Sequence, residues 1–135
     1  MFRISRRLDY GLHLLHTLAH QPGGKLTPTA ILSKELDIPL PFLHQIAHSL
    51  MQAGYIHAVP GPRGGLRLNI NPDELSILEI VNVLEGDIQL SPYTDQDEDS
   101  SHEAKKATVL IWNTLQNEIT DKLRNTPLSA LNSAE

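Results

Sequence analysis

The stretch Ile38-Pro39-Leu40-Pro41-Phe42-Leu43-His44-Gln45-Ile46-Ala47-His48-Ser49-Leu50, together with the residues that follow it up to Ile70, decides the fold of this chain. Its apolar residues recur at the spacing of one buried helical stripe, at Leu43, Ile46, Ala47 and Leu50. The two prolines lack a backbone N–H, so they suit the start of that helix. Residues 55–59 and 66–70 then predict two strands, and the Pro- and Gly-rich residues 60–65 predict a hairpin turn between them.

Two shorter helices are expected before this stretch. Residues 4–20 carry an apolar stripe through Leu8, Leu12, Leu15 and Ala19. Thr27-Pro28 is typical of a helix start, with Thr27 as the N-cap, and we expect Ile31, Leu32 and Leu36 to face inward. Two helices joined by a tight turn and followed by a hairpin indicate a mainly α fold with a small β wing, a winged helix-turn-helix.

The second half of the chain predicts a capped helix, an acidic loop and a long final helix. Ser76 and Glu79 form a capping box, and Gly86 ends that helix. The long helix, from about Glu103 to Asn125, has an apolar stripe that a domain this small cannot bury. We therefore expect a homodimer that is joined through this helix. The alternative is packing against the first helix of the same chain. The residues expected at the dimer interface are Ile111, Trp112, Leu115, Ile119 and Leu123.

The expected organisation is a DNA-binding unit at 1–86, an acidic flexible loop at 87–103 and a dimerisation helix with a terminal turn at 104–135. Charge follows this division. Residues 1–70 hold seven Lys/Arg against three Asp/Glu, and residues 71–135 hold four against thirteen. An anion-binding face is therefore expected in the first half, with chance asymmetry as the alternative.

The composition also excludes several kinds of site. The chain has no cysteine, which excludes disulfides, thiolate zinc sites and ordinary iron–sulfur ligation. Its first seven residues show no apolar h-region, so we expect no secretory signal, and no run approaches the roughly 20 apolar residues of a membrane span. We expect a cytoplasmic protein without a membrane partner and without a cofactor. No nucleophile elbow, Walker loop or HExxH motif is present, so we do not expect an enzyme.

The first half offers groups suited to double-stranded DNA. Arg6, Arg7, Lys25, Arg63 and Arg67 can neutralise phosphates. Gln45 can pair with adenine, while His44 and Ser49 can donate or accept hydrogen bonds at base edges. A helix beginning after Thr27 offers backbone N–H groups to a phosphate. A helical protein-interaction module that never touches DNA is the alternative function, and salt-dependent binding to a palindromic promoter fragment distinguishes the two.

Several segments together resemble the Rrf2 family of transcriptional regulators over nearly the whole chain. They are residues 4–10, 41–46, 53–56, 61–68, 78–81 and 85–86. The resemblance implies a winged-helix dimer on a palindromic operator, with Tyr10, the start of the recognition helix and the wing at the DNA. With the residue-based candidates, the expected DNA-binding residues are Arg6, Arg7, Tyr10, Thr27, Pro41, Phe42, His44, Gln45, His48, Gly61, Arg63, Gly64 and Arg67.

Three features depart from that family's pattern. Many members hold an iron–sulfur cluster on three cysteines, whereas this chain has none and places Lys106 where the last would lie. Pro60 stands where the wing often has an arginine, and His44 stands where some members have a carboxylate. Cluster sensing is therefore rejected. A small molecule between the long helix and the body, or a protein partner on the acidic loop, remains as the switch.

Histidines at helical spacing raise one further hypothesis. His13, His16 and His20 lie along one edge of the first helix, and His44 and His48 are one turn apart. Either spacing is compatible with a transition-metal site, although surface histidines without a ligand are the commoner case. The acidic run at Asp95, Asp97 and Asp99 lacks the glycine and glutamate of a calcium loop, so we interpret it as a solvated linker.

Overall fold

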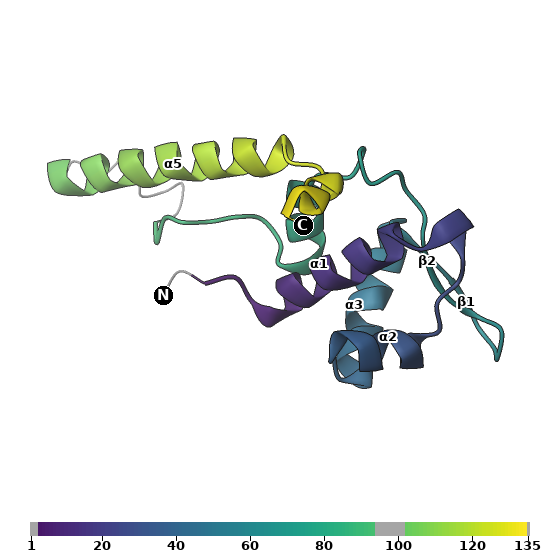
Figure 1. Cartoon of the computed structure of the whole chain (residues 1–135). Coiled ribbons are helices and arrows are strands. Elements are labelled where there is room, and N and C mark those ends of the chain that lie inside the picture. Colours follow the sequence, from purple (N-terminus) through teal and green to yellow (C-terminus); the bar gives the residue numbers. More distant parts are fainter. Residues whose placement is uncertain (1–2, 94–101, 135) are drawn as a thin grey trace.

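The body of the molecule is a winged helix, described in a computed structural model for residues 3–93 and 102–134. Three helices, α1 (Arg6–Ala19), α2 (Thr29–Leu36) and α3 (Leu40–Gln52), pack together, and a hairpin lies beside them (Figure 1). A short turn, η1 (Pro22–Gly24), links α1 to the helix pair. The predicted stripe of α3 is buried against leucines of α1, and these residues share one core. Each buried leucine contributes about 1.5–3 kcal/mol to folding.

The two-stranded hairpin is joined to the segment before α2 by an isolated β-bridge. β1 (Ile56–Val59) pairs antiparallel with β2 (Gly65–Leu68), so that Ala58 faces Leu66 and His57 faces Arg67. On the far side of β2, the Thr27 N–H donates to the Leu66 carbonyl at 2.9 Å and the Leu66 N–H donates to the Thr27 carbonyl at 2.8 Å. The segment before α2 is therefore part of the wing.

Two expectations about α2 are wrong. Thr27 is not its N-cap, because the helix begins at Thr29 with Pro28 as the N-cap and without a side-chain capping bond. Thr27 is used in the bridge to β2. Ile31 does not face inward either, since 47% of its surface is exposed, whereas Leu32 is fully buried.

The second half of the chain returns to this body before and after its long helix. α4 (Ile77–Leu84) begins with the predicted capping box of Ser76 and Glu79. After α5 (Glu103–Arg124), the turn η3 (Leu128–Ala134) comes back to the core. There the Leu128 N–H donates to the Leu75 carbonyl at 2.7 Å, and Leu128 is 1% exposed. Residues after α5 are thus packed into the same core as residues of the first 86.

α5 extends away from the body, and its C-terminal end lies over α4 (Figure 1). Its packing within the chain is therefore mainly on α4, not on α1. Of the five predicted interface residues, Trp112 and Leu123 are half-buried, and Leu123 packs against the core. Ile111, Leu115 and Ile119 are 48%, 37% and 43% exposed, and Leu110, which sequence reasoning passed over, is 68% exposed. No helix in the described ranges has the length and apolar character needed to cross a bilayer.

Arg7 connects three helices through its guanidinium group. Its Nε donates to the Leu84 carbonyl at the end of α4 at 3.0 Å. Another guanidinium nitrogen donates to Ser49 Oγ on α3 at 2.8 Å. The unpaired carbonyls at a helix C-terminus attract a cation, so this contact stabilises the end of α4. Arg7 therefore holds α1, α3 and α4 together instead of facing outward.

Replacing Arg7 with methionine tests this role, because the aliphatic stem stays while both hydrogen bonds are lost. We expect Arg7→Met to lower the free energy of unfolding by about 1–2 kcal/mol in urea denaturation. Arg6→Met is the matched control, since Arg6 is exposed and its loss should change stability by less than about 0.5 kcal/mol. Equal stability of the two variants would show that the Arg7 contacts contribute nothing.

Candidate nucleic-acid interface

The outer face of α3 carries the side chains best placed to reach another molecule. Pro41, His44, Gln45, His48 and Gln52 are all exposed, while the opposite face of the helix is buried in the core. A glutamine amide can donate and accept at once, as an adenine edge requires in the major groove. No acidic side chain lies on this helix. The face is therefore polar, uncharged or weakly basic, and accessible along its whole length.

The wing ends in a tight turn that presents Arg63. The Gly64 N–H donates to the Gly61 carbonyl at 3.0 Å, which closes a four-residue turn with Pro62 and Arg63 at its centre. A side chain at Gly64 would begin 1.8 Å from the Val59 carbonyl oxygen, so only glycine fits there. Arg63 is exposed and has no hydrogen bond or ion pair within the described chain. The turn therefore holds an available cation at the tip of the hairpin.

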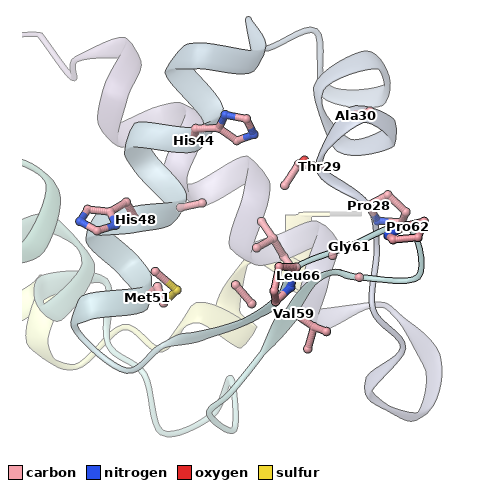
Figure 2. A pocket seen from close by; sticks show the side chains of 15 residues that line it. Pro28, Thr29, Ala30, His44, His48, Met51, Val59, Gly61, Pro62 and Leu66 are labelled. Atoms are coloured by element: carbon pink, nitrogen blue, oxygen red, sulfur yellow. The ribbon is translucent and has the colours of Figure 1, made fainter.

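A groove of about 680 Å³, called the channel below, separates α3 from the wing. Figure 2 shows His44, His48 and Met51 following one another along α3, with Val59, Gly61 and Leu66 of the hairpin on the other side. The start of α2 borders the groove at Pro28, Thr29 and Ala30. The recognition helix and the wing are thus two ridges on the same side of the molecule with a channel between them. Two projections flanking an open channel suit a double helix, whose grooves alternate with its phosphate strands.

Tyr10 and Phe42 have a positioning role. Their rings meet edge to face, with centroids 5.6 Å apart and planes at 84°. Both side chains are half-buried against the core. An edge-to-face pair of this kind contributes about 0.5–1.5 kcal/mol beyond the burial of its surface. The pair fixes the first turn of α3 to α1, and so it orients the helix whose outer face carries Gln45.

The predicted phosphate-binding cations fall into two groups. Arg6, Lys25, Arg63 and Arg67 are exposed, and Arg67 projects from β2 opposite His57. Arg7 is bonded to Leu84 and Ser49, so it is not an available cation, and Ser49 is likewise occupied. The hydrogen bonds of Arg7 could not be predicted from the sequence, because an arginine that bonds within the chain has the same neighbouring residues as one that faces solvent.

Thr27 is brought to the base of the wing but not to its surface. Only 7% of the residue is exposed, and its buried hydroxyl finds no hydrogen-bond partner in the described structure. Its backbone is what matters, since it pairs with Leu66. Sequence reasoning missed the apolar residues that border the groove, among them Met51, Pro60 and Pro62. No motif marks them, because they come from segments separated along the chain.

The histidines of α1 do not assemble into a metal site. His13 Nε2 lies 3.3 Å from an Asp9 carboxylate oxygen. His20 Nδ1 lies 2.8 Å from the His16 carbonyl oxygen, and the centroids of the His16 and His20 rings are 4.4 Å apart. Across the residues that the structure describes, no cluster of three or more histidine, aspartate or glutamate side chains is arranged to hold an ion.

A second, apolar groove of about 850 Å³ lies on the opposite side of the body from the wing. It is bordered by the N-terminal end of α1, by α4 and by the C-terminal half of α5. Ile4, Leu8 and Val81 contribute to it, as do Ile119 and Leu123 of the predicted interface. The exposed row Ile111, Leu115 and Ile119 therefore runs directly into this groove.

Known proteins resemble this chain in sequence and in fold. A family model described as Rrf2, iron-dependent transcriptional regulator, matches residues 4–134. A putative HTH-type transcriptional regulator, slr0846, from Synechocystis is 27% identical over 96% of this chain and 86% of its own. The regulator NsrR of Shouchella clausii is 35% identical over 61% of this chain and 55% of its own. The structure of CymR, titled the global cysteine regulator of B. subtilis, superposes with a TM-score of 0.83 at 26% identity, covering 100% of this chain and 99% of CymR.

The family description mentions iron, but the donor set of this chain does not fit a cysteine-held cluster. There is no cysteine anywhere in the sequence. The match nevertheless spans both the winged helix and the long helix. The chain therefore belongs to the Rrf2 family of transcriptional regulators.

Proposed function

We propose that this protein is a cytoplasmic, sequence-specific repressor that binds a palindromic operator as a homodimer. The observation that carries the proposal is the placement of α3 and the wing on one side of the body, with an open channel between them. Gln45 and Pro41 are the groups that enter the major groove, and Gln45 pairs with adenine. His44 and His48 border the channel beside the wing. Gly61, Arg63 and Gly64 form the part of the wing that approaches the minor groove.

Phosphate contacts provide the affinity in this proposal. Arg63 and Arg67 serve the strand next to the wing. Arg6, by contrast, borders the groove on the opposite side of the body. Tyr10 and Phe42 act by fixing the angle of α3, as does Arg7. Thr27 acts through its backbone bridge to the hairpin. Of the thirteen predicted DNA-binding residues, these last four are therefore supports of the reading surface.

A second copy of the chain supplies a packing partner for the exposed apolar row of α5. Ile111, Leu115 and Ile119 form an exposed apolar row that continues into the groove beside α1 and α4. Because this row and the groove are both apolar and adjoin, two copies related by a two-fold axis cover both at once. Two reading heads related by that axis match two half-sites about 34 Å apart, one turn of the double helix, on a palindrome.

In this proposal, an effector changes the DNA affinity of the repressor by changing the spacing of its two winged helices. A small molecule or a protein partner changes DNA affinity only if it binds one arrangement of the dimer better than another. The junction of α5 with the body is the element that sets this arrangement, because η3 and α4 anchor one end of α5 to the core. The acidic loop proposed as the binding site of a protein partner is described only at residues 87–93 and 102–103, and its acidic run at 95–99 lies outside the described residues.

Arg63→Ala tests the wing. We expect DNA affinity to fall about 5- to 100-fold for all sequences, and the slope of log affinity against log salt to become shallower by about 0.9, because one phosphate contact is lost. Fluorescence anisotropy on a promoter fragment recovered by genomic footprinting measures both. Arg124→Ala is the matched control: it removes the same charge at the end of α5, where Arg124 is paired with Asp121. An unchanged slope for Arg63→Ala would contradict this placement of the wing.

Leu115→Asp tests the dimer. The substitution places a carboxylate in the apolar row, and burying it without a partner costs several kcal/mol, so we expect monomers with weak operator binding. Sedimentation velocity measures the mass of the species in solution. Asn117→Asp adds the same charge to an exposed position on another side of α5, and it should remain a dimer. If Leu115→Asp sediments as a dimer, the row on α5 is not the interface.

A further inference from the structure

The channel between α3 and the wing is distinguished by its ionisable groups. Fifteen described residues border it, and His44 and His48 are the ionisable ones among them. The remainder are apolar residues, glycines and one threonine. Both histidines are exposed, and neither has a hydrogen bond or ion pair to a neighbouring side chain within the described chain. An imidazole pair without a competing carboxylate is a binding site whose charge depends on pH.

We infer that the sugar–phosphate backbone of one DNA strand lies in this channel, and that protonated His44 and His48 hold its phosphates, so that the protein binds DNA more tightly at pH 6 than at pH 8. This inference rests on the DNA-binding function proposed above. It adds a subsite, its ligand and a linkage to pH that the fold alone does not imply. The apolar walls at Met51, Val59 and Pro62 suit the deoxyribose faces between phosphates.

The direction of the effect follows from linkage. An anion beside an imidazole favours its charged form, so DNA binding takes up protons wherever the free histidine is neutral. Histidine side chains ordinarily titrate near pH 6.5, and DNA phosphates stay charged throughout this range. The affinity therefore rises as pH falls from 8 towards 6, and it levels off once both imidazoles are charged in the free protein.

The elements packed around α3 do not provide a competing charge in the channel. On α1, Arg7 is bonded to Ser49 and Asp9 lies beside His13. On α4, Glu79 accepts from Ser76 in the capping box. None of these four charged or titratable groups borders the channel.

The same holds for the remaining neighbours of α3. Lys34 and Glu35 of α2 are exposed but lie outside the channel lining. On the hairpin, His57 lies opposite Arg67 in the strand register, whereas the channel is bordered by Ala58 and Leu66, the next pair along. An incoming phosphate therefore meets His44 and His48 before any carboxylate, and the pH response is assigned to these two residues.

The experiment measures binding to a mixed-sequence duplex of about 30 base pairs at low salt, because phosphate contacts do not require the operator. Anisotropy titrations at pH 6.0 and 8.0, at equal ionic strength, compare the wild type with the double variant His44→Gln/His48→Gln. We expect the wild type to bind about tenfold more tightly at pH 6.0, with a salt slope steeper by about one to two. The double variant should lose most of both differences.

His102→Asn is the control. His102 lies at the far end of α5 from the wing, where asparagine can replace it as the N-cap, so the pH response should persist (Figure 1). Wild-type binding that is equal at the two pH values overturns this inference and leaves the proposed regulator intact. A response that survives in the double variant also overturns it. Absence of DNA binding at every pH overturns the proposed function itself.

Discussion

The short antiparallel bridge between Thr27 and Leu66 is the contact on which the reading surface depends. Two backbone hydrogen bonds, of 2.9 and 2.8 Å, tie the chain just before α2 to the outer edge of β2. A two-stranded hairpin is marginal in water by itself, so a third strand and a core contact are needed to hold it in one place. The bridge therefore fixes the distance between the hairpin and the two helices, and that distance is the width of the channel.

Two glycines of the wing, Gly64 and Gly65, allow the close backbone contacts at the base of the hairpin. A side chain at Gly65 would begin 2.4 Å from the Thr27 carbonyl, and one at Gly64 would begin 1.8 Å from that of Val59. The run of glycines thus allows three pieces of backbone to approach at the base of the hairpin. The position of Arg63 at the tip of the hairpin depends in this way on backbone contacts at the base of the hairpin. Rigid backbone support behind an exposed turn pre-organises a recognition surface.

The sequence predicted those parts whose signal is local or periodic. The stripe of α3, the capping box at Ser76 and the hairpin turn all follow from neighbouring residues, and each is present. The prediction that Thr27 caps α2 was wrong, because its local preference for a helix start is overridden by backbone pairing with Leu66, far along the chain. The internal bonds of Arg7 could not be predicted for a related reason, since its partners lie on two other helices. The channel itself has no sequence signature, because its walls come from three separate elements.

The distribution of charge explains how an acidic protein can approach a polyanion. The described carboxylates of the second half lie on α4, on α5 and in the segments around them, whereas α3 has none. A molecule charged in this way is turned by the field of the DNA before contact, so that its acidic end points away. The channel adds a second level, because it is neutral until its imidazoles gain protons. The fixed charges, which lie far apart on the molecule, thus orient it toward DNA. In the proposed site, the protonation of His44 and His48 sets the affinity.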